Sequence, residues 1–239
     1  ELGGLAPMRR FGLEVSGRML ESKKALPALK RRGFAGFNAD EVMQSGVTRS
    51  IAMQNANIIG DFKQQFFRMT GGAAVIPECV TMDLGLDEAM QNEEFCAALF
   101  KLLSGMATDL HLLNIRLALP VRIPNLNPGM IEFCLELRNR LMLPQLCFSI
   151  DIHPHELAGG DCDPAQILRW LKFDIGTVRF FYEPEIGNRL VNKSIEPWLK
   201  FLAGTAFDGQ VTFCPRCTSV ETTVHELTAV QELLSGYLA

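Results

Sequence analysis

Four short runs in the second half of the chain decide the fold: IRLALPVRI (residues 115–123), LCFSIDI (146–152), TVRFFY (177–182) and QVTFC (210–214). Each run is rich in β-branched, aromatic and other apolar residues, and several are apolar almost without interruption. Such runs are typical of strands that are covered on both faces in a parallel sheet. They recur at intervals of about 30 residues, which is the size of one β-α-β unit.

The first half of the chain contributes four more candidate strands, at Arg10–Ser16, Phe34–Phe37, Arg49–Met53 and Ala73–Val80. Between the strands, apolar residues recur every three or four positions, as in Glu93–Leu110, which predicts amphipathic helices. Because no Gly-x-Gly-x-x-Gly follows the first strand, closure of the sheet is favoured over an open doubly wound sheet. The sequence therefore predicts an α/β protein, a (β/α)8 TIM barrel with residues 1–239 in a single domain.

Composition narrows the class of protein. The 239 residues are 48% hydrophobic and 21% charged, which is enough apolar material for one large core. The net charge of −4 gives no reason to expect a nucleic-acid partner. No run reaches the 18 or so apolar residues of a membrane span, and the first residues do not resemble a signal peptide. Seven scattered cysteines, an odd number, are typical of reduced thiols, so we expect a cytoplasmic protein.

The order of these segments resembles a known family. NIRLALPVRIPNL (114–126) precedes LCFSIDIHPHELAGGDCDPAQILRWL (146–171), in which Leu157-Ala158-Gly159 is followed by Asp163-Pro164 at a helix start. FDGQVTF (207–213) follows as the last strand. This series is similar to that of the xylose-isomerase-like barrels, which include sugar-phosphate isomerases and epimerases and the endonuclease IV group. The resemblance implies a barrel that binds a sugar or sugar phosphate at its C-terminal mouth.

The same resemblance implies a divalent cation held by two glutamates, an aspartate and a histidine from the last four strands. The matching positions here are Pro120, Asp151, Phe180 and Cys214, of which only Asp151 is a ligand of the expected kind. A shift of one residue offers Arg179 or Glu183 and does not restore the set. Hard cations require several oxygen ligands, so we expect no cofactor at the family's metal site.

Several polar residues are expected at the mouth, where strands end and βα loops begin. In the segment Asp151-Ile152-His153-Pro154-His155, alternation along an extended chain places Asp151, His153 and His155 on one side. We therefore predict these three as catalytic or acid–base residues. The predicted substrate-binding residues are Glu14, Glu78, Arg122, Glu183 and Arg216.

A second metal chemistry stays open. Cys214-Pro215-Arg216-Cys217 is a Cys-x-x-Cys motif at the end of the last strand. Together with His153 or His155 it would supply the nitrogen and sulfur ligands that select zinc. The alternative interpretation is two buried structural thiols, because an isolated Cys-x-x-Cys is a weak signal.

Two functional hypotheses follow. In the first, the barrel isomerises or epimerises a sugar or sugar phosphate, with Asp151, His153 and His155 in ligand or acid–base roles. In the second, the barrel has lost catalysis and serves as a binding or partner protein. An endonuclease activity ranks third, because it would require a multi-metal, histidine-rich centre in basic surroundings. The sequence makes no prediction about the oligomeric state.

Overall fold

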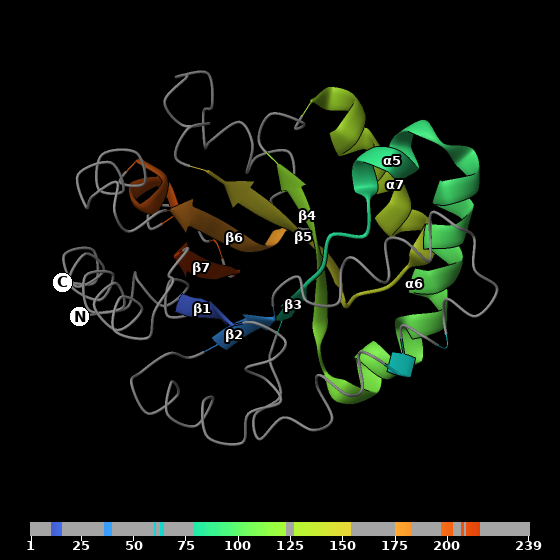
Figure 1. Cartoon of the computed structure of the whole chain (residues 1–239), viewed down its shortest axis with the longest axis horizontal. Helices are drawn as coiled ribbons and strands as arrows, with labels where there is room; N and C mark the ends of the chain where they lie inside the picture. The colour runs from blue at the N-terminus through green and yellow to red at the C-terminus, as the bar shows by residue number, and fades with distance from the viewer. Residues whose placement is uncertain are drawn as a thin grey trace.

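The fold is a closed barrel of parallel strands with helices packed on its outside (Figure 1). We analysed a computed structural model, which describes residues 11–15, 36–39, 60, 63–64, 79–122, 127–153, 175–182, 197–202, 207 and 209–215. Its strands are β1 (Phe11–Val15), β2 (Gly36–Ala39), β3 (Cys79–Thr81), β4 (Arg116–Arg122), β5 (Leu146–Ile152), β6 (Ile175–Tyr182) and β7 (Gln210–Pro215).

All neighbouring strands run parallel, and β7 pairs with β1 to close the barrel. The predicted α/β barrel is confirmed, and within the described residues it closes through seven strands. β2 pairs directly with β3, since Asn38 lies opposite Cys79 in the register. The strand predicted at Arg49–Met53 lies outside the described residues.

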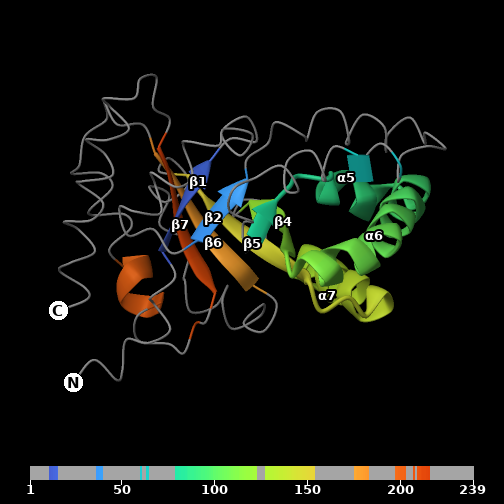
Figure 2. The ribbon, with the colours of Figure 1, turned by 90° about the horizontal axis from the view of Figure 1, so that it is seen from below.

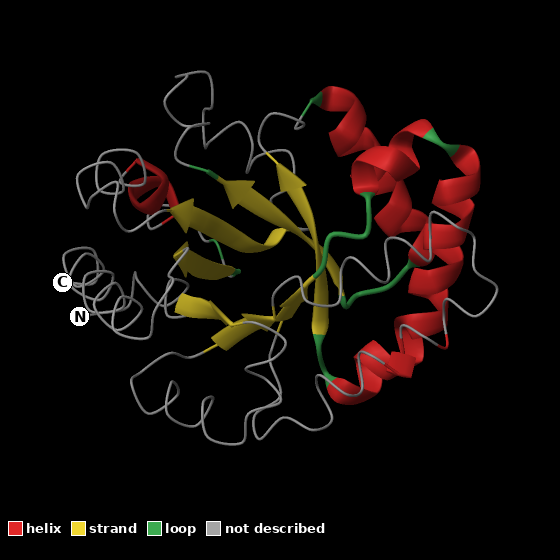
Figure 3. Cartoon of the chain, viewed as in Figure 1, coloured by secondary structure: helices red, strands yellow, loops and turns green. Residues whose placement is uncertain are grey.

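Apart from the helical residues 197–202, which lie beside β6, the described helices gather on one side of the barrel, next to β3, β4 and β5 (Figures 1 and 3). They are α5 (Leu86–Gln91), α6 (Glu93–Leu113) and α7 (Pro128–Leu141). Asparagine caps two of them, because the side chain of Asn92 accepts from the N–H of Phe95 and that of Asn127 from the N–H of Met130. The view in Figure 2 shows the same three helices lying together at one end of the molecule.

Helix α6 has the amphipathic pattern that the sequence predicts. Its buried residues are Phe95, Leu99, Leu102, Leu103, Met106 and Leu110. These residues join the strands' outward apolar side chains in one core cluster. By length and composition alone α6 would also qualify as a membrane span. That is weak evidence for a membrane, because an outer helix of a barrel that packs one apolar stripe on the sheet passes the same test.

The two faces of the strands differ in chemistry. Phe148, Ile150, Val178 and Phe180 belong to the apolar core cluster with the helices. The alternate residues are polar yet buried: Thr81, Ser149, Asp151, Thr177, Arg179, Gln210 and Thr212. Residues directly opposite in a parallel register share a face, and Asp151 pairs with Arg179, which pairs with Thr212. The polar set therefore lines the inside of the barrel.

Pro120 lies in the middle of β4, a position that normally disfavours proline because it has no N–H. The N–H of Leu117 points to β5 and donates to the Gln145 carbonyl, whereas the carbonyl of Ala118 points to β3 and accepts from Met82. The backbone N–H and carbonyl groups of successive residues point alternately to the two neighbouring strands, so the backbone nitrogen of Pro120 points toward β3. β3 has already ended at Thr81, opposite Ala118. The missing donor of Pro120 therefore breaks no hydrogen bond of the β3–β4 ladder.

Candidate functional site

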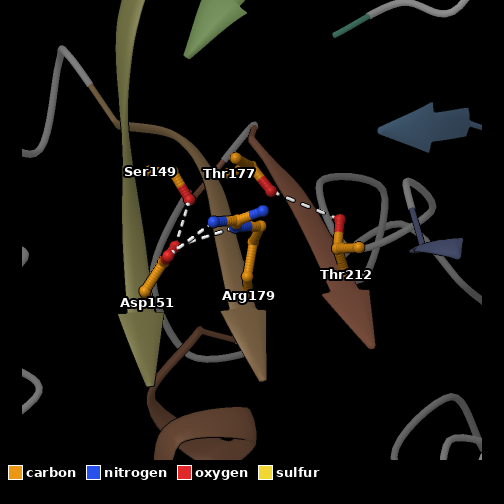
Figure 4. Close-up of polar contacts among 5 residues, drawn as sticks. All are labelled: Ser149, Asp151, Thr177, Arg179 and Thr212. Carbon is orange, nitrogen blue, oxygen red and sulfur yellow. Dashed lines mark hydrogen bonds and ion pairs between the residues drawn. The ribbon is translucent and has the colours of Figure 1, made fainter. Parts of the chain in front are cut away.

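A buried ion pair joins the ends of β5 and β6 inside the barrel. Arg179 Nε donates to Asp151 Oδ1 at 2.8 Å, and Arg179 Nη2 donates to Asp151 Oδ2. The two side chains are only 0% and 6% exposed. Figure 4 shows them pointing toward each other from neighbouring strands. A bidentate geometry of this kind fixes both side chains and matches the planar guanidinium to the carboxylate.

Hydroxyl groups surround this pair. Ser149, two residues before Asp151 on β5, donates from Oγ to Asp151 Oδ1 at 2.8 Å. On the neighbouring strands the hydroxyls of Thr177 and Thr212 lie 3.3 Å apart (Figure 4). Asp151 therefore accepts three hydrogen bonds from two partners, and its charge is compensated by that of Arg179. Buried charges are tolerated in proteins under these conditions.

Two aromatic rings, those of His153 and Phe181, lie two residues further along β5 and β6 than the ion pair, toward the C-terminal ends of the strands. The ring of His153 stacks on that of Phe181, with centroids 4.6 Å apart and an angle of 8° between the planes. The guanidinium carbon of Arg179 lies 4.8 Å from the centroid of the same Phe181 ring. Both His153 and Phe181 are half-buried. The histidine is thus held at the boundary between the closed interior and the mouth.

The structure brings together part of the predicted site. Asp151 and His153 contact Arg179 and Phe181, which are also two residues apart, so both point to the same face as alternation predicts. Arg122, at the end of β4, is opposite Asp151 in the register and exposed. Glu14 lies in β1, of which only the backbone is described. The other predicted residues, Glu78, His155, Glu183, Arg216 and Cys217, lie outside the described residues.

Sequence reasoning considered Arg179 only as the alternative that a one-residue shift offers, and it did not include this residue in the predicted site. The position matched to a family metal ligand on this strand was Phe180, which instead packs edge-on against Trp198 in the outer core, with ring centroids 6.5 Å apart. The inward residue at the level of Asp151 is Arg179. Thr177 faces inward, so every second residue along β6 from Thr177 also faces inward, and the first of these is Arg179. The sequence alone does not show which of the two alternating sets faces inward.

Asp151 and the residues around it do not form a site for a hard divalent cation. Both carboxylate oxygens of Asp151 accept hydrogen bonds from a cation that belongs to the chain itself. Within the described ranges no three His, Cys, Asp or Glu side chains come together as metal ligands would. For the zinc alternative, Phe181 lies opposite Cys214 in the register and stacks on His153, so its ring lies between these two predicted ligands. The remaining predicted zinc ligands, His155 and Cys217, are not described.

The opposite end of the barrel interior contains two thiols. Cys79 and Cys147 are buried together with Ala118, apart from the main core. The Cys147 thiol donates to the carbonyl of Leu117 at 3.6 Å. The neighbouring Cys79 thiol lowers the pKa of Cys147 and so does the guanidinium of Arg116, against the opposing effect of burial. The interaction with Cys147, together with burial, raises the pKa of Cys79 well above its ordinary value. This end of the barrel is a packed structural layer, since conserved chemistry in such barrels lies at the other mouth.

Comparison with known structures agrees with this architecture. A D-psicose 3-epimerase solved in the presence of D-fructose matches with a TM-score of 0.60 at 15% identity, over 87% of this chain and 75% of that one. A D-psicose 3-epimerase from Clostridium cellulolyticum H10, solved with D-tagatose, matches with a TM-score of 0.55 at 11% identity, over 93% and 81% of the two chains.

A family 2 AP endonuclease from Brucella melitensis matches with a TM-score of 0.54 at 13% identity, over 94% of this chain and 90% of that one. Comparison with protein-family models and with curated proteins gave no match. Epimerases and an endonuclease thus share this architecture, so the likeness concerns the fold and leaves the reaction open. The chain has the TIM-barrel fold that these solved structures share, as its sequence predicts.

Proposed function

We propose that this barrel binds a small polar metabolite of the sugar or sugar-phosphate class at its C-terminal mouth, without a divalent cation. The observation that carries the proposal is the buried Asp151–Arg179 pair with its hydroxyl neighbours, below a half-buried His153. A polar, water-excluding interior that opens at the C-terminal strand ends is where barrels of this type bind ligands.

Specific groups suit such a ligand. Arg122 presents an exposed guanidinium at the end of β4, and a guanidinium binds phosphate oxygens in a bidentate manner. His153 lies at the boundary of the mouth and is the described residue best placed to move a proton. Asp151 is a positioning residue in this proposal, because Arg179 and Ser149 already occupy its oxygens. Glu14, Glu78, His155, Glu183 and Arg216 remain predicted members of the site.

The names of the solved structures support the ligand class. Two of them are D-psicose 3-epimerases studied with D-fructose and D-tagatose, so barrels of this shape accommodate ketohexoses. If the chain is catalytic, isomerisation or epimerisation of a sugar is the reaction class we propose. A cytoplasmic location stays a prediction; the described cysteines, at 79, 96, 134, 147 and 214, form no disulfide.

The competing proposal is a binding protein without catalysis. The specific observation in its favour is that the retained aspartate is engaged in an ion pair and is therefore poorly placed to remove a proton from a ligand. Both proposals place the ligand at the same mouth, and they differ only in whether turnover follows binding.

The test is a thermal-shift screen of ketohexoses, sugar phosphates and polyols, followed by assays of aldose–ketose interconversion with and without EDTA. We expect a stabilising ligand whose effect is lost in His153→Ala and kept in His111→Ala. His111 is a matched control because it is an exposed histidine on α6 that hydrogen-bonds Gln145, away from the mouth. A ligand whose binding is unaffected by changes at His153 and Arg122 would contradict the proposed location.

A further inference from the structure

Arg179 occupies an unusual position for a charged side chain. It is among the largest fully buried side chains of the described residues, and it lies inside the barrel beside the one aspartate that the family resemblance identifies as a metal ligand. Its guanidinium contacts that carboxylate through two nitrogen atoms and lies against the ring of Phe181. A positive charge is therefore built into the place where the resemblance implies a bound dication.

We propose that Arg179 is the resident cation of this barrel: its guanidinium supplies, as part of the chain, the positive charge for which a metal-dependent barrel recruits a divalent ion. The inference deepens the proposed function. It rests on that function in one respect only, namely that the mouth of the barrel is the ligand site. It makes Arg179 a second barrier to metal binding, in addition to the missing oxygen ligands.

Electrostatics gives the first argument. A dication coordinated by Asp151 would lie about 5 Å from the guanidinium, and at an effective dielectric constant of about 20 their repulsion weakens metal binding by roughly 10⁵-fold. The loss of other ligands adds to this effect, since Pro120 offers no donor and Cys214 is a soft ligand for a hard ion. Restoring oxygen ligands alone should therefore not restore a metal site while Arg179 is present.

The surroundings of the guanidinium give the second argument. An unpaired carboxylate at the position of Asp151, 6% exposed, would be strongly destabilised. Arg179 neutralises it, while Ser149 supplies a further hydrogen bond and Phe181 a cation–π contact. Together these groups form a compartment with one carboxylate, hydroxyls and an aromatic face, which is the composition of a binding site for a planar cation.

Removing the side chain should turn this compartment into a site for a cation in solution. The test uses Arg179→Ala, guanidinium chloride in the tens of millimolar, and sodium chloride at the same ionic strength as the reference. We expect guanidinium to raise the Tm of Arg179→Ala by about 3–6 °C at a concentration tenfold above its Kd. We expect no such gain in the unmodified protein or in the Asp151→Asn/Arg179→Ala double variant.

Arg122→Ala is the matched control, because Arg122 is an exposed arginine on the neighbouring strand. Guanidinium should not raise its Tm. Manganese titrations followed by the loss of the free-ion paramagnetic resonance signal form the second arm: Arg179→Ala should bind manganese more tightly than the unmodified protein, in which binding at Asp151 should be undetectable. If Arg179→Ala does not fold, Arg179→Gln serves for both measurements, and Arg179→Lys, which keeps the charge, should continue to reject manganese.

Two results would overturn the proposal: stoichiometric manganese bound through Asp151 in the unmodified protein, or an arginine-free variant that gains neither guanidinium nor manganese binding. These measurements use no sugar. A failure to find a sugar ligand would therefore contradict the proposed function and leave the role of Arg179 standing, and the reverse also holds.

Discussion

The buried pair at the barrel mouth makes a quantitative prediction about stability. In Asp151→Leu the guanidinium of Arg179 keeps its position at 0% exposure and loses both of its carboxylate contacts. Breaking one partner of a buried ion pair costs about 3–5 kcal/mol, since the remaining charge is uncompensated. For a chain of this length, that loss corresponds to a decrease in Tm of very roughly 6–20 °C.

The double variant Asp151→Leu/Arg179→Met separates the value of the pair from the cost of an unpaired charge. Replacing both partners by apolar residues of similar volume is often neutral in other proteins. Here Ser149 loses its acceptor, at a cost of about 1–3 kcal/mol, so we expect the double variant to lie above Asp151→Leu and below the unmodified protein. The coupling free energy in the cycle should exceed about 2 kcal/mol.

Urea unfolding measured by circular dichroism gives each free energy of unfolding from the midpoint and the slope. Glu136→Gln is the control, because Glu136 pairs with Arg140 at 3.5 Å with both side chains about 60% exposed. Its loss should cost at most a few tenths of a kcal/mol. If Asp151→Leu costs no more than Glu136→Gln, or no more than the double variant, the guanidinium is not held in a desolvated interior and the account of the site is wrong.

Three further predictions concern the barrel wall and the helices. A Cβ at Gly176, where the β5–β6 register shifts, would overlap the sulfur of Cys147, so Gly176→Ala should cost about 1–3 kcal/mol in urea unfolding and Cys147→Ala should restore part of it. Asn92→Ala and Asn127→Ala each remove a side-chain cap and should cost about 1 kcal/mol, with Gln at the same positions as a control that cannot cap. Because the pKa of Cys147 is lowered in the fold and that of Cys79 is raised, Cys147 stabilises the protein as the pH rises through its lowered pKa, whereas Cys79 destabilises it at higher pH. Cys147→Ala should lack the first effect in unfolding titrations, and an unchanged pH profile would contradict the lowered pKa of Cys147.

The parts of the fold that could be predicted are those with strong local signals. Leu146–Ile152 coincides with β5, and the predicted helix at Glu93–Leu110 is α6 with three more residues. These segments combine an unbroken apolar pattern with clear ends, since Asn92 caps α6 and Asn114 ends it in a left-handed conformation. In these segments the apolar pattern and the capping residues indicate the same ends, so the boundaries could be predicted from the sequence.

Other boundaries depend on the neighbours of a strand. The strand predicted at Ala73–Val80 overlaps β3, Cys79–Thr81, which continues one residue further, to Thr81, between its partners β2 and β4; the predicted residues 73–78 lie outside the described residues. β6 begins at Ile175, two residues before the predicted start, because the chain includes an irregular pairing step beside Phe148. Pairing partners that are distant in the sequence decide such ends, and a single sequence does not specify them.

The site shows the same division. Alternation along β5 was enough to place Asp151 and His153 on one face. It was not enough to pair Asp151 with Arg179, since that contact requires the register between two strands 28 residues apart. The choice between Phe180 and Arg179 changes the predicted chemistry of the mouth completely, because one is a packing residue and the other a permanent charge.

The differences at the mouth from the pattern that the resemblance implies are related to one another. If the oxygen ligands of the other strands were lost while Asp151 remained, the barrel would contain a buried carboxylate without a counterion, and its folding would be penalised by several kcal/mol. Arg179 removes that penalty and at the same time excludes a dication. A barrel that has acquired this arginine is stable without metal, whereas one that had merely lost ligands would be unstable. A metal site could therefore be restored in one order only: Arg179 must be replaced before a new ligand at Pro120 or Cys214 can support a metal.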